Sequence, residues 1–234
     1  MANSARNQPG AENITTSVEE PEINPLDTVQ DLYEKNKKMI STAVTAVVLV
    51  VGGFLGYMFL IKAPNEKKAA ESMAMPQLFF QVDSMNLALT GDGKNAGFPK
   101  IEGKYKGSDA GNLAHYYSGI AYLKTGDFKS AIKSLKEFDG KGTILDNQAI
   151  GSLGIAYMES GDRDKAIECF KKATDGDKDI LTTPVYLYQM ALAYESKGNT
   201  NEAKNIYIKI RDEYPRSIQA RDMDKELARL GVLD

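Results

Sequence analysis

The ten residues LGIAYMESGD at positions 153–162 have two counterparts in the same chain, SGIAYLKTGD at 118–127 and MALAYESKGN at 190–199. The tyrosines of the three copies are 35 and 37 residues apart, and the turn glycines Gly126, Gly161 and Gly198 keep the same intervals. Apolar residues recur at three- and four-residue spacing on both sides of each Gly-Asp or Gly-Asn step, which predicts a helix, a tight turn and a second helix. The pattern therefore predicts a repeat protein built of helical hairpins.

The spacing resembles that of the tetratricopeptide repeat family, whose units carry a Leu-Gly, a Tyr, an Ala with an aromatic residue, and a Pro in this order. The middle copy matches best and continues into Ala166 and Phe170, while the third copy ends at Pro215. The family's early tryptophan is missing, since the chain has no Trp. The resemblance implies an all-α solenoid of about three repeats over residues 112–216, and such solenoids bind other proteins.

Small residues are expected where the two helices of a hairpin cross closely, and aromatic residues where neighbouring hairpins leave wider gaps. The residues predicted to pack the repeats in this way are Gly119, Tyr122, Ala131, Gly154, Tyr157, Ala166, Phe170, Tyr194, Ala203 and Tyr207. The extra length over the family's unit of about 34 residues is predicted in the loops 139–147 and 175–184. Each loop has an Ile-Leu pair, at 144–145 and 180–181, which is expected to tuck against the start of the next unit.

A last amphipathic segment, residues 217–230, is predicted to cap the stack, because the final repeat would otherwise expose its apolar face. Ala220, Met223, Leu227 and Leu230 lie on one face of it, and Gly231 is placed as its C-terminal stop. Residues 217–234 are thus expected to form a C-terminal capping helix.

A run of twenty-three uncharged residues, Met39 to Ile61, is long enough to cross a bilayer as a helix. A secretory signal peptide would have an apolar core of about 7 to 15 residues close to the N-terminus, whereas 38 residues precede this run. Residues 31–63 are therefore predicted to be a transmembrane anchor in contact with lipid. Three lysines flank each end, so the charge bias leaves the orientation open. Gly52 and Gly56 form a GxxxG spacing that allows two such helices to pair as a homo-oligomer, although glycine is common in membrane helices.

The segments around this run are predicted to be less regular. Residues 1–30 are polar and expected to form a disordered tail. Residues 64–111 are expected to hold one amphipathic helix and a Gly-rich loop, with Pro76 either kinking a helix or marking the first turn of a new one. The helix is expected either to cap the front of the stack or to occupy its groove; its apolar face is Leu78, Val82, Met85 and Leu89.

The composition argues against nucleic-acid binding and against an internal disulfide. The 234 residues are 42% hydrophobic and 26% charged, with a net charge of −3, which gives no basic surface for nucleic acid. The single cysteine, Cys169, is expected to be a small core residue and forms no internal disulfide.

No catalytic or metal site is recognisable in the sequence. His115 is the one histidine, so there is no histidine pair for a metal. Asp175, Asp177 and Asp179 alternate as in a calcium loop, but Ile180 and Tyr186 stand where that motif needs Gly and Glu. The stretch 91–94, GDGK, lacks the spacing of a phosphate loop. We therefore expect neither an enzyme nor a cofactor.

The tetratricopeptide resemblance implies a concave groove lined by the first helix of each repeat. The matching positions are Leu113, Tyr116, Ile120, Leu123 and Lys124, then Gln148, Gly151, Ile155, Met158 and Glu159, then Val185, Tyr188, Leu192, Glu195 and Ser196. This surface is largely apolar and suits a peptide segment or a partner helix. Family members that clamp C-terminal carboxylates use Lys and Asn where this chain has Tyr116 and Ile120, so that mode is not expected. Alternatively, Tyr116, Ile120, Val185 and Leu192 pack against the chain's own helix around 78–89.

The layout of a polar tail, one span and a small repeat domain is similar to that of the YfgM-like ancillary subunits of the bacterial Sec translocon. That resemblance implies a single-pass inner-membrane protein with a periplasmic repeat domain, which binds translocon components or envelope chaperones. N-anchored import receptors of the mitochondrial surface have a compatible layout with cytosolic repeats, so a cytosol-facing receptor or scaffold is the alternative. An anchored enzyme is not favoured, because no catalytic site was found.

Overall fold

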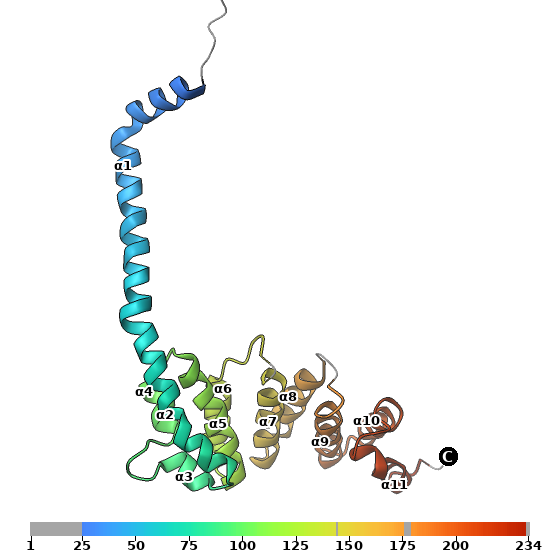
Figure 1. Ribbon diagram of the computed structural model, residues 1–234. Coiled ribbons are helices and arrows are strands. Elements are labelled where there is room, and N and C mark those ends of the chain that lie inside the picture. Colours follow the sequence, from blue (N-terminus) through green and yellow to red (C-terminus); the bar gives the residue numbers. More distant parts are fainter. Residues whose placement is uncertain (1–24, 144, 176–178, 233–234) are drawn as a thin grey trace, which may run out of the picture. The chain divides into compact units, whose positions relative to one another are not determined.

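The computed structural model describes residues 25–143, 145–175 and 179–232, and all the regular structure within them is helical apart from one isolated bridge between Gly91 and Ala96. The chain divides into two compact units, Met1–Leu55 and Gly56–Asp234, which are described one at a time. Figure 1 shows the order of the helices along the chain.

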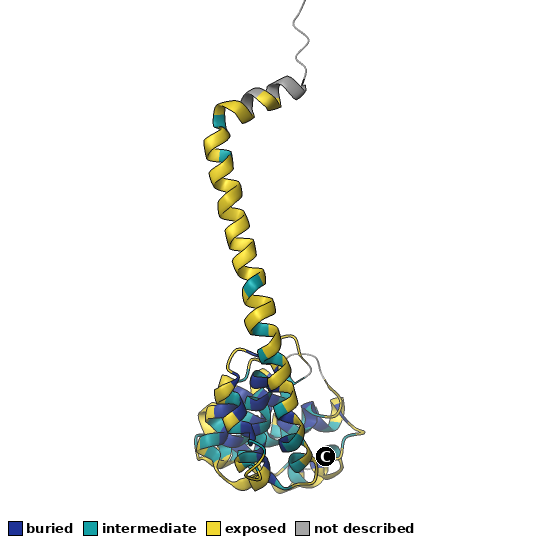
Figure 2. Cartoon of the chain, turned by 60° about the vertical axis from the view of Figure 1, so that its left-hand side comes forward, coloured by how far each residue is buried: buried dark blue, intermediate teal, exposed yellow. Residues whose placement is uncertain are grey.

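The described residues of the first unit, 25–55, belong to one long helix, α1 (Pro25–Tyr57), whose last two residues lie in the second unit and are followed by a π-helical turn, Met58–Lys62. The helix begins at Pro25, inside the predicted polar tail; residues 1–24 lie outside the described part of the chain. Its valines and leucines between 44 and 55 are exposed, as the yellow ribbon in Figure 2 shows. Within the described residues, one helical run, Tyr33–Gln81, is long and apolar enough to cross a membrane, and its most apolar window has a mean hydropathy of 2.4.

The second unit opens with α2 (Ala63–Gln81), α3 (Met85–Thr90) and α4 (Phe98–Lys104). The prediction of one helix with an apolar face from Leu78 to Leu89 was wrong. The chain leaves the helix at Val82, and Asp83 takes a left-handed φ of 58°. Leu78 and Val82 are consequently 49% and 62% exposed.

The buried side of α2 is formed by other residues than those predicted: Ala69, Met73 and Pro76. Pro76 lies inside this helix, so it does not mark the first turn of a new one. A buried cluster joins α2 to α4 and to the first repeat helix, and it consists of Ala69, Met73, Ala88, Phe98, Ile101, Tyr105, Ala110 and Ala114. Helices α2, α3 and α4 therefore close the front of the repeat stack.

A carboxylate from α2 caps the first repeat helix, α5 (Asp109–Thr125). Glu66 accepts hydrogen bonds from the backbone amides of Asp109 at 2.7 Å and Ala110 at 2.9 Å. The Ser108 hydroxyl oxygen accepts a third, from the Gly111 amide at 2.9 Å. Helix N-termini leave such amides unpaired and favour negative charge, so this contact fastens α2 to the repeats.

We expect Glu66→Ala to lower the free energy of unfolding by about 1–2 kcal/mol, because two amides of α5 lose their acceptor together with a favourable charge. Glu66→Gln should lower the free energy of unfolding less, since its side-chain amide oxygen can still accept hydrogen bonds from the two backbone amides. Glu71→Ala, an exposed position on the same helix, is the control and should stay within about 0.5 kcal/mol. Urea denaturation of the full chain in mild detergent measures all three, and equal losses for Glu66→Ala and Glu71→Ala would contradict the cap.

Three helical hairpins follow, one for each sequence repeat (Figure 1). The turn glycines Gly126, Gly161 and Gly198 have φ of 81°, 89° and 78°, the left-handed region in which glycine costs least. Asp127 then caps its helix by accepting a hydrogen bond from the Ser130 amide. The helices are α5 with α6 (Phe128–Glu137), α7 (Asp146–Glu159) with α8 (Arg163–Asp175), and α9 (Thr183–Ser196) with α10 (Thr200–Glu213).

Two of the residues predicted to pack the repeats, Gly119 and Gly154, lie where two helices approach closely. A Cβ added to Gly119 would come within 2.4 Å of Leu135 Cγ, and one added to Gly154 within 2.6 Å of a ring carbon of Phe170. The remaining predicted residues divide into two groups: Ala131, Ala166, Ala203, Phe170 and Tyr207 are fully buried, whereas Tyr122, Tyr157 and Tyr194 are half-buried.

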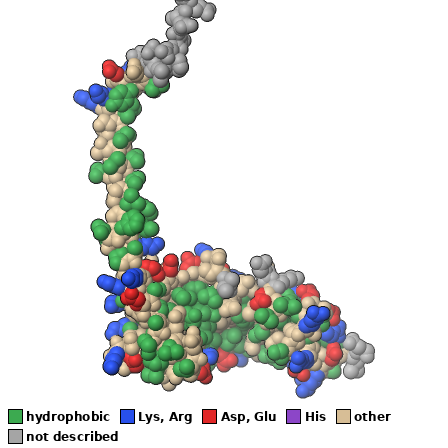
Figure 3. Space-filling model, viewed as in Figure 1, with side chains coloured by type: hydrophobic (Ala, Val, Ile, Leu, Met, Phe, Trp, Pro, Cys, Tyr) green, Lys and Arg blue, Asp and Glu red, His purple; other side chains and the backbone are tan. Residues whose placement is uncertain are grey.

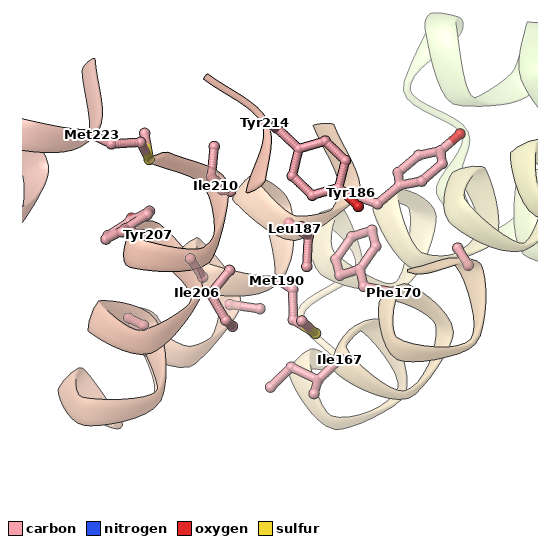
Figure 4. Close-up of a cluster of buried hydrophobic side chains, with 14 of the residues drawn as sticks. Ile167, Phe170, Tyr186, Leu187, Met190, Ile206, Tyr207, Ile210, Tyr214 and Met223 are labelled. Carbon is pink, nitrogen blue, oxygen red and sulfur yellow. The ribbon is translucent and has the colours of Figure 1, made fainter. Parts of the chain in front are cut away.

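The C-terminal end is a 3₁₀ turn, Gln219–Asp222, followed by α11 (Met223–Arg229), in place of the single helix predicted for 217–230. Met223 and Leu227 are buried, and Ala220 and Leu230 pack beside them in a large cluster with α8, α9 and α10 (Figure 4).

The Ile-Leu pairs of the two inter-repeat loops were predicted to tuck against the next unit. This prediction was wrong for Ile180 and Leu181, which are 59% and 76% exposed. Leu145 is half-buried, and Ile144 lies outside the described residues.

Candidate protein-binding face

The first helices of the three hairpins, α5, α7 and α9, are neighbours in the stack, since α5 contacts α7 and α7 contacts α9. Figure 3 shows hydrophobic side chains gathered on one face over the repeat helices. Of the residues predicted for the groove on α5 and α9, five apolar ones are half-buried and pack against neither of the two buried clusters in the described part of the chain. We call them the open face residues: Tyr116, Ile120, Leu123, Val185 and Leu192.

Tyr116 joins the repeat helices along this face. Its hydroxyl lies 3.2 Å from the Gln148 side-chain oxygen on α7, and its ring contacts the rings of Tyr117 and Phe138 at centroid distances of 5.6 and 5.4 Å. Burial raises the pKa of the Tyr116 phenol, so it stays a neutral hydrogen-bond donor. A rigid aromatic ring with a polar end is a common anchor for protein partners.

Other residues predicted for the groove serve the packing of the domain. Leu113 packs against the front cluster, whereas Ile155, Met158 and Tyr188 pack against the C-terminal cluster. Gly151 leaves no open space, because a Cβ there would lie 2.2 Å from the Tyr186 ring. The binding face is therefore narrower than the sequence pattern predicts.

Two of the charged residues predicted for the groove, Lys124 and Glu195, are already paired. Lys124 binds the carboxylate of Asp83 at 3.0 Å and lies 5.7 Å from the centre of the Phe80 ring. Glu195 accepts hydrogen bonds from the Tyr207 hydroxyl at 2.5 Å and from the Arg229 guanidinium at 2.7 Å. Glu159 and Ser196 are exposed, and Ser196 accepts a hydrogen bond from Arg163 at 2.8 Å. A partner would thus meet an apolar strip with few free charges.

Sequence reasoning missed the role of Glu195 because its partners lie on other helices. Tyr207 comes from α10 and Arg229 from α11, and together they hold the C-terminal cap against α9. Burial, together with this carboxylate, raises the pKa of the Tyr207 phenol. No local spacing relates positions 195, 207 and 229.

In the part of the chain that the structure describes, the front helices reach only the α5 end of the groove. Among the described residues, α2 and α3 contact α5 but neither α7 nor α9. The alternative that Tyr116, Ile120, Val185 and Leu192 pack against the chain's own helix around 78–89 is therefore wrong for Val185 and Leu192, which lie on α9. Tyr116 and Ile120 lie on α5, which does contact α2 and α3. The face on α9 stays available to a partner.

The described residues hold no group of three metal-ligating side chains. His115 Nδ1 lies 3.2 Å from a carboxylate oxygen of Glu102, and both side chains are largely buried between α4 and α5. Cys169 is buried, and this burial raises the pKa of its thiol, which disfavours the nucleophilic thiolate.

The buried phenol of Tyr186 predicts a loss of stability at high pH. Burial raises its pKa to about 12, against about 10 in an unfolded chain. The folded state therefore keeps a proton that the unfolded state loses, so the free energy of unfolding falls as pH rises from 10 to 12. We expect Tyr186 to account for at most about 2.7 kcal/mol of this fall.

Urea denaturation at pH 9 to 12 measures the effect. Tyr186→Phe should make the free energy of unfolding less dependent on pH over this window, whereas Tyr157→Phe, which removes a hydroxyl from a half-buried ring, serves as the matched control. Parallel pH profiles for wild type and Tyr186→Phe would contradict the assignment.

Two sequence profiles of the tetratricopeptide repeat match the chain, over residues 148–179 and 186–217. Two solved crystal structures of MamA are similar in fold, both with a TM-score of 0.50 and 20% sequence identity. One alignment covers 74% of this chain and 87% of MamA, and the other 86% and 98%. A search of curated proteins found no match. The chain thus contains tetratricopeptide repeats in an all-helical solenoid.

Proposed function

We propose that this chain is a single-span membrane protein whose repeat unit acts as a non-catalytic adaptor and binds a segment of another protein. The observation that carries the proposal is the set of open face residues, which remain half-exposed although the clusters on either side of them are closed. Tetratricopeptide repeats bind other proteins, and an apolar strip with an aromatic anchor suits an extended peptide or one helix of a partner. The anchor would be the run from Met39 to Ile61.

The cellular role that we propose is protein translocation or biogenesis in the bacterial envelope, with the repeat unit in the periplasm. Its support is the resemblance of the layout to ancillary subunits of the Sec translocon. A cytosol-facing receptor or scaffold is the alternative, because the flanking lysines do not fix the orientation. Pairing of two copies through Gly52 and Gly56 would be compatible with either, since nothing within 4 Å covers these glycines in the single chain.

The binding face is tested by introducing charge. We expect Ile120→Asp with Leu192→Asp to weaken recovery of the partner at least about tenfold, because desolvating two carboxylates in the interface is costly. Leu181→Asp with Ile218→Asp makes the same chemical change at positions 76% and 73% exposed, and is the control. The partner is identified beforehand with a photo-crosslinking residue at position 120 in living cells. Equal recovery from both double variants would remove the proposed face.

Anchoring and orientation need separate measurements. Resistance of the full chain to alkaline extraction from membranes tests the anchor. To test the orientation, a tag is placed after the last residue, and cells with a permeabilised outer membrane are treated with protease. The result tells on which side of the inner membrane the repeat unit lies. Digestion of the tag would support the periplasmic proposal, and protection would support the cytosolic alternative.

A further inference from the structure

A pocket of about 360 Å³ lies between α2, α4 and the loop that precedes α4, and none of its lining residues belongs to the open face residues. Three lysines line it, Lys94 from the loop and Lys100 and Lys104 from α4. No carboxylate lies within 4.0 Å of their ammonium groups in the described part of the chain. Lys104 lies over the Tyr105 ring at 5.0 Å from its centroid. In a protein with a net charge of −3, three lysines without a carboxylate partner around one cavity point to an anionic ligand.

The carboxylate in the same loop is directed to the loop itself. Asp92 accepts hydrogen bonds from the backbone amides of Lys94 at 2.9 Å and Asn95 at 2.6 Å, and from the Asn95 side chain at 3.0 Å. These bonds fix the loop that carries Lys94. They also lower the pKa of the Asp92 carboxyl, so this carboxylate stays ionised and cannot donate a hydrogen bond to a ligand.

The floor of the pocket offers one free hydroxyl hydrogen. Ser72 donates its own to the Lys68 carbonyl at 2.7 Å, and Thr90 donates its own to the Asn86 carbonyl at 2.8 Å. The Tyr105 hydroxyl oxygen also accepts from the Ser72 hydroxyl at 3.3 Å, so the hydrogen of Tyr105 itself can turn to a ligand. The hydrogen bond from Ser72, followed by the Lys104 ammonium group, lowers the pKa of the Tyr105 phenol, because a donor and a positive charge both stabilise the phenolate.

We infer that this pocket binds a phosphate group, held by Lys94, Lys100 and Lys104 with the Tyr105 hydroxyl as an additional donor. Three ammonium groups carry more positive charge than is needed to neutralise one carboxylate. Lysine also binds phosphate as a point charge from any direction. The phosphate has two sources, a soluble phosphate compound or the headgroup of an anionic lipid. Ser72 follows Ile61 by eleven residues, roughly 16 Å along a helix, which is compatible with the lipid source. The lipid source rests on the proposed anchor, whereas the soluble source does not.

Two arms distinguish the sources, both with the full chain. Inorganic phosphate is titrated calorimetrically into chain held in phosphatidylcholine nanodiscs, at constant ionic strength. Retention of phosphatidylglycerol against phosphatidylcholine is measured by native mass spectrometry from mild detergent. We expect Lys94→Gln with Lys100→Gln and Lys104→Gln to weaken binding at least about tenfold in one of the arms, because three attractive charges are lost.

The matched control is Lys129→Gln with Lys133→Gln and Lys136→Gln, which removes three exposed positive charges from α6. Weaker binding by the pocket variant, with unchanged binding by the control variant, supports the site. The arm in which binding weakens identifies the source of the phosphate group. Absence of binding in both arms, or equal weakening by both triple variants, would overturn it. Should the chain prove not to be anchored, the phosphate arm still decides the site.

Discussion

Phe170→Ala is expected to lower the free energy of unfolding by about 3–5 kcal/mol. The Phe170 side chain is fully buried between the second and third hairpins, stacked on the Tyr186 ring at a centroid distance of 6.4 Å with 17° between the planes. Its other side faces Gly154, where no Cβ fits. The neighbours are helical backbone and rings that cannot close the space, so the substitution leaves a cavity.

A double-mutant cycle makes this prediction specific. Alone, Gly154→Ala should be destabilising, because its Cβ would lie 2.6 Å from the Phe170 ring. In the Phe170→Ala background the same methyl fills part of the cavity, so the two losses should fall short of additivity by at least about 1 kcal/mol. Phe128→Ala, at a half-buried position on α6, is the control for removal of a phenyl ring. Urea denaturation of the full chain in mild detergent measures the cycle, and strict additivity would show that the two residues do not share one space.

Gly97→Ala should cost about 3 kcal/mol or more. An added Cβ would lie 2.0 Å from the Leu89 carbonyl oxygen and 2.4 Å from its carbon. Since these are backbone atoms, no change of rotamer relieves the overlap, and α3 must move away from the start of α4. The displacement would also disturb Phe98, which is fully buried in the front cluster.

Gly103→Ala is the matched control, six residues further along in α4. Nothing lies within 4 Å of an added Cβ there, and alanine favours a helix over glycine, so we expect a gain of up to about 1 kcal/mol. The same denaturation experiment compares both variants. If Gly97→Ala were as stable as Gly103→Ala, the close approach of α3 and α4 would be refuted.

The fold of the repeats could be predicted from local spacing. Gly126, Gly161 and Gly198 mark the turns, because each needs a left-handed backbone that glycine adopts most readily. Gly119 and Gly154 mark the helix crossings, because a side chain would meet Leu135 or Phe170. These requirements act within one hairpin, so about twenty consecutive residues contain the information.

The front of the domain could not be predicted in this way. The pattern from Leu78 to Leu89 fits one amphipathic helix, yet the chain turns at Asp83 and buries Met73 instead of Leu78. Which side of α2 becomes buried depends on α4 and α5, which supply Phe98, Tyr105 and Ala114 to the same cluster. A periodic pattern says that a helix has an apolar face, but not which partner will cover it.

For the candidate sites the division is similar. The residues of the binding face follow from the repeat register, since equivalent positions of equivalent helices lie side by side in a solenoid. Whether each position is open depends on distant residues: Asp83 pairs Lys124, Arg229 pairs Glu195, and the Tyr186 ring covers Gly151. The lysine pocket likewise forms only when α2 and the loop before α4 meet. Sequence periodicity thus established the hairpins, the turns and the apolar span, because these depend on neighbouring residues along the chain. Contacts between segments tens of residues apart determined which surfaces stay available for binding, because burial and charge pairing are properties of the packed helices.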